Sequence, residues 1–304
     1  MTDFFNKERT VDEGIETIKL RLLDELAEEY PDTKYDSKDF YFSIDKFYRK
    51  SKTQFVIVID EWDAVFREYK EDKEGQEKYL DFLRNWLKDK GYIALAYMTG
   101  ILPVKKFGKH SDLNMFDEYS MTNQMQFAPY AGFTEDEVEG LCKRYGRDFK
   151  QIKDWYDGYR LSNKLSKEIL AEDAVIDTKV YREYEIYSPY SVVEAMRTGD
   201  VNNYWNQTET YEALKQYIDW NFEGLKEDIT VLMEGGRIPV DIKSYQNDMT
   251  TFNSKDDILT MLIHLGYLGY DRDTEELFIP NKEVLDVFKS STKNRDWSVT
   301  FRAL

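Results

Sequence analysis

Cysteine, histidine and long hydrophobic runs are the features that this sequence has least of. Cys142 is the only cysteine among 304 residues, so no internal disulfide can form, which fits a reducing, cytoplasmic compartment. His110 and His264 are the only histidines, too few for a His-rich metal site. No apolar run approaches the roughly 18 residues that a membrane helix needs. The N-terminus has neither the basic region nor the apolar core of a signal peptide.

Positive charge is also scarce. The chain has 42 Lys and Arg residues against 59 Asp and Glu residues, giving a net charge of −17. A surface this acidic repels phosphate backbones, which disfavours nucleic-acid binding by the chain as a whole. It most often means a well-solvated surface, although it also suits a basic protein partner. The hydrophobic content of 41% is enough for a folded core, and the length predicts two or three domains.

The run Phe55–Ile59 is wholly apolar and mostly β-branched, and it predicts a strand buried on both faces within a parallel sheet. Asp60, Glu61 and Asp63 follow it, at the sheet edge where open α/β sheets bind ligands. Such a run ending in Asp-Glu resembles the Walker B pattern of P-loop ATPases. There the first carboxylate holds magnesium and the second polarises the attacking water. The alternative is a core strand whose acidic end simply meets solvent.

A second strand is predicted over 92–98, after a helix over 75–90 that Gly91 would cap. Strand, helix and strand with a short linker imply a right-handed crossover, so the two strands should pair in parallel. Thr99 follows the second strand, at the position that the P-loop pattern gives to sensor 1, a residue near the γ-phosphate. A threonine hydroxyl at a strand end more commonly forms a hydrogen bond with a backbone group there.

Helices are predicted over 11–30 and 39–50, before the first strand. Residues 103–124 read as a loop with local positive charge at Lys105, Lys106 and Lys109, and Tyr119–Met121 as a short strand. A further helix begins after Thr134, which forms a capping box with Glu137.

The region 155–205 is aromatic and rich in loops, and we expect Trp155, Tyr159 and Arg160 to form a structural cluster rather than a ligand cage. Helices over 228–233 and 256–264 precede a predicted hairpin of 266–271 with 276–280. Helices followed by a hairpin indicate a winged-helix-like module. Because acidic residues surround it, we interpret it as a packing or protein-docking module rather than a DNA reader.

The predicted fold class is therefore α/β: a partial P-loop NTPase-like parallel sheet, then a mainly helical region, then a C-terminal winged-helix-like module. The corresponding domains are 1–130, 131–225 and 226–304.

Several stretches taken together resemble the bacterial AAA-ATPase-like proteins of gut anaerobes, over residues 55–288. These are P-loop proteins whose chains usually continue into a PD-(D/E)XK nuclease-like domain. The stretches are Val58–Asp63, Met98–Gly100, Leu113–Phe116, Gly132–Val138, Trp155–Tyr159, Tyr187–Pro189 with Ser191–Val193, Asn203–Trp205 and Ile279–Val284. The resemblance implies Mg-ATP as the cofactor, Asp60 as the metal ligand, and Glu61 and Thr99 as catalytic residues.

One departure from the family pattern decides the functional expectation. Family members carry a phosphate-binding Gly-Lys loop well before the Walker B strand, whereas Gly14, within a helix pattern, is the only glycine before Phe55. The sole Gly-Lys, Gly108-Lys109, lies downstream with Pro103 where the leading glycine belongs. We therefore expect impaired or absent ATP binding and action through protein contacts. The alternative is an active ATPase whose phosphate loop lies upstream of Met1. A nuclease-like domain is not visible in this sequence.

Without the strand that leads into a phosphate loop, the strand over 92–98 would keep an open edge. Pairing with the segment Tyr119–Met121 would close that edge within one chain. Another chain could cover it instead. The sequence favours internal closure and a monomer, because a loop of this length closes at modest entropic cost.

Overall fold

The computed structural model describes residues 1–6, 8–102, 113–163, 182–205, 221–243, 245, 252 and 254–291. Predictions that concern Lys105, Lys106, Lys109, His110 and the Gly108-Lys109 pair lie outside these residues. The described residues form two compact units, 1–118 and 119–291. Each is described by itself below, and the predicted division of the second at 225/226 stays a prediction.

Helices frame the first unit. α1 (Val11–Glu29) begins with a capping box between Thr10 and Glu13, and α2 (Phe40–Ser51) begins at Asp39; both agree with the predicted ranges. The short helix α3 (Ala64–Glu68) and the longer α4 (Lys73–Leu87) follow β1. The prediction that Gly91 caps α4 is wrong. The Lys88 N–H closes the last turn on the Arg84 carbonyl, so the helix ends before it reaches Gly91.

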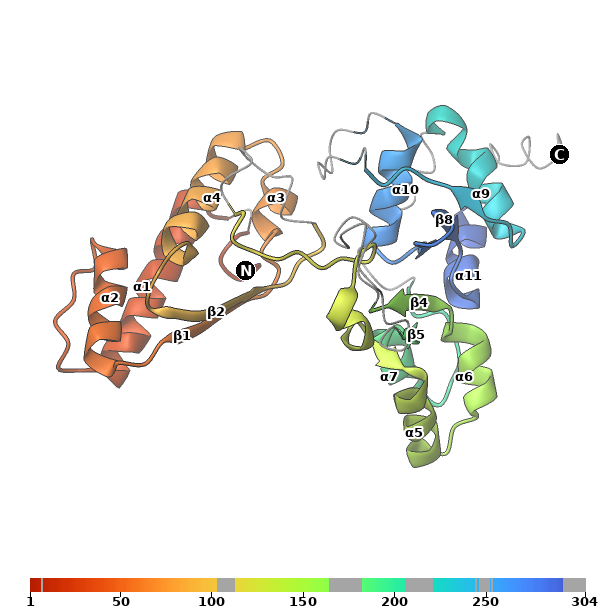
Figure 1. Ribbon diagram of the computed structural model, residues 1–304, viewed down its shortest axis with the longest axis horizontal. Helices are drawn as coiled ribbons and strands as arrows, with labels where there is room; N and C mark the ends of the chain where they lie inside the picture. Colours follow the sequence, from red (N-terminus) through yellow and green to blue (C-terminus); the bar gives the residue numbers. More distant parts are fainter. Residues whose placement is uncertain are drawn as a thin grey trace, which may run out of the picture. The chain divides into compact units, whose positions relative to one another are not determined.

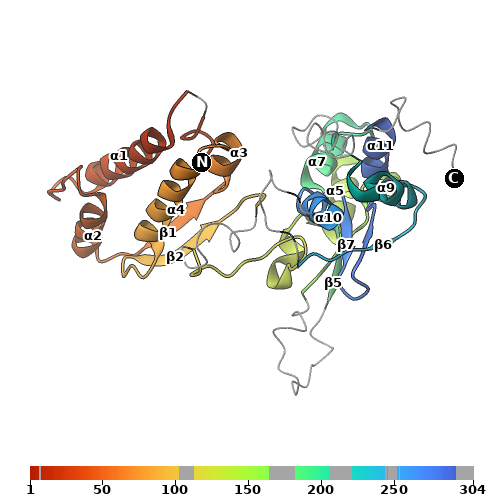
Figure 2. The same cartoon turned by 90° about the horizontal axis from the view of Figure 1, so that it is seen from above.

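The strands β1 (Phe55–Ile59) and β2 (Ile93–Met98) pair in parallel, which confirms the predicted strand–helix–strand unit. Figure 1 shows α1 and α4 on one side of this pair. Figure 2 shows the two strands side by side beneath α4. The core of the unit lies between these layers and includes Phe47, Ile59, Tyr79 and Leu83, all nearly or wholly buried.

The prediction that both strands are buried on both faces is wrong for the described structure. Val56 and Val58 of β1 are 62% and 68% exposed, while Ile59 is buried. Leu95 and Tyr97 of β2 are 56% and 44% exposed. The helices of the first unit cover one face only, so alternate side chains of these apolar strands point to solvent.

The preferred closure of the sheet edge by Tyr119–Met121 is also wrong. Ser120 and Asn123 exchange both backbone hydrogen bonds, at 3.1 and 2.9 Å, and form an isolated bridge. The backbone N–H and C=O groups of Ser120 and Asn123 are therefore hydrogen-bonded within a local turn. Among the described residues, β2 pairs with β1 alone.

The second unit is built from short helices around two small antiparallel sheets. The first sheet has the order β3-β5-β4, and the second has the order β6-β8-β7. The sequence did not predict β4 and β5, because a region dense in aromatic residues was interpreted as loops. The elements, in chain order, are η1 (Met125–Tyr130), β3 (Phe133–Thr134), α5 (Glu135–Tyr145), α6 (Phe149–Tyr156), β4 (Tyr159–Ser162), β5 (Glu183–Tyr187), α7 (Pro189–Thr198), η4 (Phe222–Gly224), α9 (Leu225–Met233), β6 (Ile238–Pro239), α10 (Lys255–His264), β7 (Gly269–Asp271), β8 (Glu276–Phe278) and α11 (Lys282–Ser291).

Several predictions for this unit are confirmed. Thr134 and Glu137 form the expected capping box at the start of α5. The hairpin is β7 with β8, and β6 adds a third strand to it. The predicted cluster of Trp155, Tyr159 and Arg160 is not formed as one group: Tyr159 and Trp155 pack in different hydrophobic clusters, and the exposed Arg160 pairs with Glu185 across β4 and β5. The winged-helix-like character of the C-terminal part stays a prediction.

The motif stretches of the second unit converge on one buried carboxylate, Glu283 at the start of α11. Ser191 of α7 donates to its Oε2 at 2.7 Å, and the Tyr204 N–H donates to its Oε1 at 2.7 Å. Nearby, Gly158 adopts a φ of +141°, and a Cβ there would lie 1.6 Å from the Pro280 carbonyl oxygen. Four stretches that are far apart in the sequence thus meet at one point, which we call the Glu283 node.

Candidate functional site

The carboxyl ends of β1 and β2 bring together two of the predicted site residues. The ladder continues past both strands, since the Thr99 N–H donates to the Ile59 carbonyl and the Trp62 N–H to the Thr99 carbonyl, each at 2.9 Å. The Thr99 hydroxyl donates a short hydrogen bond to Oδ1 of Asp60. Oδ1 also accepts the Glu61 N–H at 3.0 Å. We call Asp60, Glu61 and Thr99 the acidic edge.

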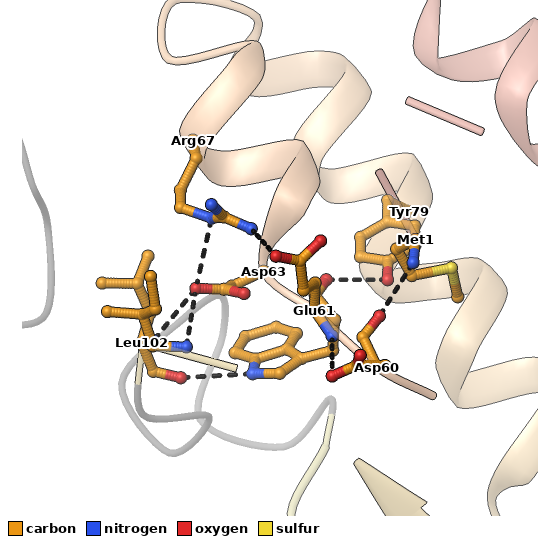
Figure 3. Close-up of polar contacts among 9 residues, drawn as sticks. Met1, Asp60, Glu61, Asp63, Arg67, Tyr79 and Leu102 are labelled. Atoms are coloured by element: carbon orange, nitrogen blue, oxygen red, sulfur yellow. Dashed lines mark hydrogen bonds and ion pairs between the residues drawn. The ribbon is translucent and has the colours of Figure 1, made fainter. Parts of the chain in front are cut away.

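Glu61 lies beside a cation from the helix that follows it. Its Oε1 is 3.5 Å from Nη2 of Arg67, and its side chain remains 43% exposed (Figure 3). Its φ of 53° falls in the left-handed region, which non-glycine residues rarely adopt and which is frequent at functional sites. The backbone therefore turns sharply at Glu61 and leaves its carboxylate at the surface.

Asp63, the third carboxylate of the motif, has a different role because its side chain is fully buried. Oδ2 accepts the N–H groups of Ile101 and Leu102 at 3.1 and 3.0 Å, and lies 3.6 Å from Nε of Arg67. Burial raises the pKa of Asp63, while Arg67 and these N–H groups oppose the rise. Asp63 therefore holds the chain after β2 against the start of α3.

Trp62 also links the chain after β2 to the residues that follow β1. Its indole N–H donates to the Leu102 carbonyl at 3.2 Å, and its own carbonyl accepts the Tyr79 hydroxyl at 2.8 Å. A Cβ at Gly100 would lie 2.5 Å from the Trp62 ring and 2.8 Å from Oδ1 of Asp63. Glycine is therefore required at position 100 for the two strand ends to approach this closely.

The N-terminal amino group also lies at this place. The Met1 ammonium donates to the Asp60 carbonyl at 2.8 Å (Figure 3). Together with Arg67, it places two positive charges next to the carboxylates in this chain. Both positive charges would compete with a bound cation.

The geometry of Asp60 suits a magnesium ion that arrives with phosphates. Its Oδ2 accepts no hydrogen bond from a described residue, the side chain is exposed, and the Thr99 hydroxyl is adjacent. Mg²⁺ prefers oxygen ligands and is usually held by one or two carboxylates together with phosphates and water. Among the described residues, no group of three or more His, Cys, Asp or Glu side chains is placed to hold a metal. A metal at this edge would therefore depend on ligands from a nucleotide.

Sequence reasoning did not identify Arg67, Trp62 and Gly100 as parts of this site. Arg67 had a usable signal, because it follows Asp63 by four residues and a short helix places the two side chains on one face. The contacts of Trp62 and Gly100 had none, because they depend on how closely the two strand ends approach.

The second unit holds another charged cluster. Lys153 contacts both Glu135 and Asp157, and the Tyr187 hydroxyl donates to Glu135 at 3.2 Å. Burial raises the pKa of Asp157 and of Glu185; Glu135 raises that of Asp157 further while Lys153 opposes the rise, and Asp157 raises that of Glu185 further. These groups join α5, α6 and β5, so their evident role is to hold the unit together.

Comparison with known proteins supports one family. Residues 3–110 match the model of a family described as a predicted AAA-ATPase, which agrees with the AAA-ATPase-like family indicated by the motifs. The match covers about a third of the chain, nearly all of the first unit, and includes the acidic edge. No curated protein and no solved structure matches the chain. None of the described helices is both long and apolar enough to cross a membrane.

Proposed function

We propose that the acidic edge is the metal-binding and water-positioning side of a P-loop ATPase-type nucleotide site. The observation that carries this proposal is the hydrogen bond between Thr99 and Asp60 at the ends of two adjacent parallel strands. Ligands of open α/β sheets bind at this edge. The family match over residues 3–110 supports the same assignment.

In this proposal each group has a separate task. Asp60 would hold Mg²⁺ through its Oδ2, and the ion would neutralise charge on the phosphates. Glu61 would orient the attacking water, since its carboxylate is exposed beside Asp60. Thr99 would contact the γ-phosphate or that water. Asp63 and Arg67 would keep this arrangement in place without contacting the nucleotide.

We further propose that this chain alone binds Mg-ATP weakly or not at all, and that it acts through protein contacts. Carboxylates repel phosphates, and most phosphoryl-transfer catalysis comes from positioning and charge neutralisation by a phosphate loop and its lysine. The described residues before β1 supply no such loop. The second candidate is an active ATPase, which the Thr99–Asp60 contact also favours.

Isothermal titration of the whole chain with Mg-ATP separates the two candidates. We expect no binding tighter than about 100 µM. Sub-micromolar binding that is lost in Asp60→Ala and kept in Glu25→Ala, an exposed acid on α1, would overturn this proposal and establish the active ATPase. Sub-micromolar binding that survives Asp60→Ala would place the nucleotide elsewhere and contradict both.

A further inference from the structure

One face of the β1–β2 pair, which no described helix of the first unit covers, carries a patch of large hydrophobic side chains. Val56 is the register partner of Leu95, and Val58 is the partner of Tyr97, so the four are cross-strand neighbours. Their exposed fractions run from 44% to 68%. We call these four residues the bare face. Figure 1 shows the covering helices α1 and α4 on the opposite side of the strands.

Such a face is unusual for a parallel pair of strands. Parallel strands occur almost only in sheets that are covered on both faces, and their sequences are correspondingly apolar throughout. Here the sequence has the two-sided apolar pattern, but described residues of the first unit supply cover on one side only. An exposed apolar patch of this size is often functional.

The two ends of the bare face carry opposite charges. Lys50 and Lys52 precede β1, and Lys90 precedes β2, so the amino end is basic apart from Asp89. Asp60, Glu61 and Asp63 follow β1 and outnumber Arg67 and the Met1 ammonium beside them, so the carboxyl end stays acidic. If two such faces meet with antiparallel strands, each acidic end lies over a basic end. With parallel strands, like charges would meet.

We propose that the bare face binds the bare face of a second copy of this chain, with the strands of the two copies antiparallel. A two-fold axis that lies in the plane of the interface and perpendicular to the strands produces this arrangement and makes the contact self-complementary. The four side chains expose on the order of 400 Å² per copy, about half of the roughly 800 Å² per partner in a standard interface. The dimer is therefore weak and forms in the micromolar range or above.

Pairing of another segment of the same chain with the edge of β2 does not compete with this contact. The segment Tyr119–Met121, which the sequence favoured as the closing strand, forms a local bridge instead. That pairing was the reason to expect a monomer. The dimer does not depend on nucleotide binding, so it is measured without nucleotide and its failure leaves the proposed function untouched.

Sedimentation equilibrium of the whole chain from about 5 to about 500 µM is the test. We expect reversible dimerisation that Val58→Lys weakens by at least about tenfold. Leu95→Gln is a second, milder variant for the same face. Leu20→Lys, at a 46% exposed position on α1, is the matched control and should dimerise like the wild type. Circular dichroism verifies that each variant is folded.

A charge variant tests the strand direction. Lys52→Glu should weaken the dimer, and so should added salt, because opposite ends attract each other only in the antiparallel arrangement. Dimerisation that is insensitive to Val58→Lys and Leu95→Gln contradicts the proposal. So does a wild type that stays monomeric at every concentration. In that case, slow thiol labelling of Val58→Cys would show that another segment of the same chain covers the face.

Discussion

The acidic edge of the first unit and the Glu283 node of the second place carboxylates in opposite environments. Asp60 is exposed and its Oδ2 accepts no hydrogen bond from the described residues, whereas Glu283 is fully buried and both of its oxygens accept hydrogen bonds. Burial raises the pKa of Glu283 to about 7, although the bonds from Tyr204, Ser191 and Trp205 oppose the rise. The comparison separates a carboxylate that is available to a ligand from one that is committed to the fold.

Asp63 makes the same distinction within a single motif. It lies three residues from Asp60, yet it is buried and accepts two backbone N–H groups. Of the acids that follow β1, one therefore stabilises the site and the other two face outward. A motif of adjacent carboxylates does not by itself say which of them carries chemistry.

The largest effect that we expect is at Glu283. Glu283→Ala removes the acceptor of the buried Tyr204 N–H and the closer partner of the Ser191 hydroxyl, which keeps only a 3.4 Å contact with Ser188. Each such loss costs about 1–3 kcal/mol, so the free energy of unfolding should fall by about 2–5 kcal/mol in urea titrations. Glu139→Ala, at an exposed pair with Lys143, is the control and should change it by less than about 0.5 kcal/mol. Equal effects of the two variants would contradict a structural role for Glu283.

The second-largest effect that we expect is on the pH dependence of the free energy of unfolding. The folded pKa of Glu283, about 7, lies above its ordinary value of 4.5, so folding favours the protonated form. This contribution is fully present below pH 4.5 and is lost as the pH rises through 7. It amounts to a few kcal/mol at most. The measurement is the free energy of unfolding of wild type and Glu283→Gln from pH 4.5 to 8.

Asp63, Asp157 and Glu185 also have raised pKa values and contribute with the same sign. They remain in both proteins, so the difference between wild type and Glu283→Gln isolates Glu283. We expect this difference to change across the pH window. A constant difference would contradict the raised pKa.

A smaller contrast is expected between Asp63 and Asp60. Asp63→Ala leaves the N–H groups of Ile101 and Leu102 without their acceptor and Arg67 with Glu61 alone. We expect a loss of about 2–3 kcal/mol in the free energy of unfolding. Asp60→Ala, at an exposed position, should cost less than about 1 kcal/mol. A reversed order in urea unfolding would overturn the division between the two residues.

The sequence predicted the local features of the fold well. The ranges of α1 and α2 followed from helical spacing, the parallel pair from two apolar runs around α4, and the start of α5 from its capping box. The positions of Asp60 and Thr99 at the ends of their strands were predicted, and the parallel pairing brings them to one edge, where they form a hydrogen bond that was not predicted. These are effects of neighbouring residues or of a single short crossover.

Features that depend on long-range packing could not be predicted in the same way. The four stretches that meet at Glu283 are up to 130 residues apart, and each was visible only as a motif without a contact. The apolar pattern of β1 and β2 predicted cover on both faces, yet the pattern of one segment cannot identify what supplies that cover. Arg67 differs from these features, because its i,i+4 spacing from Asp63 was visible in the sequence and only its contact with Glu61 depends on the turn before α3.

The central proposal is that Asp60 and Thr99 form the nucleotide-facing edge of this chain, so that a metal–nucleotide complex at high concentration lies beside them even when it binds weakly. Paramagnetic broadening of backbone amide signals by Mn²⁺-ATP tests the position directly, because it reports proximity even at low occupancy. We predict selective broadening at Glu61, Thr99 and Gly100 in the wild type, and its loss in Asp60→Ala but not in Glu25→Ala. Broadening that is centred on Glu135 and Asp157, or that persists unchanged in Asp60→Ala, would contradict the claim.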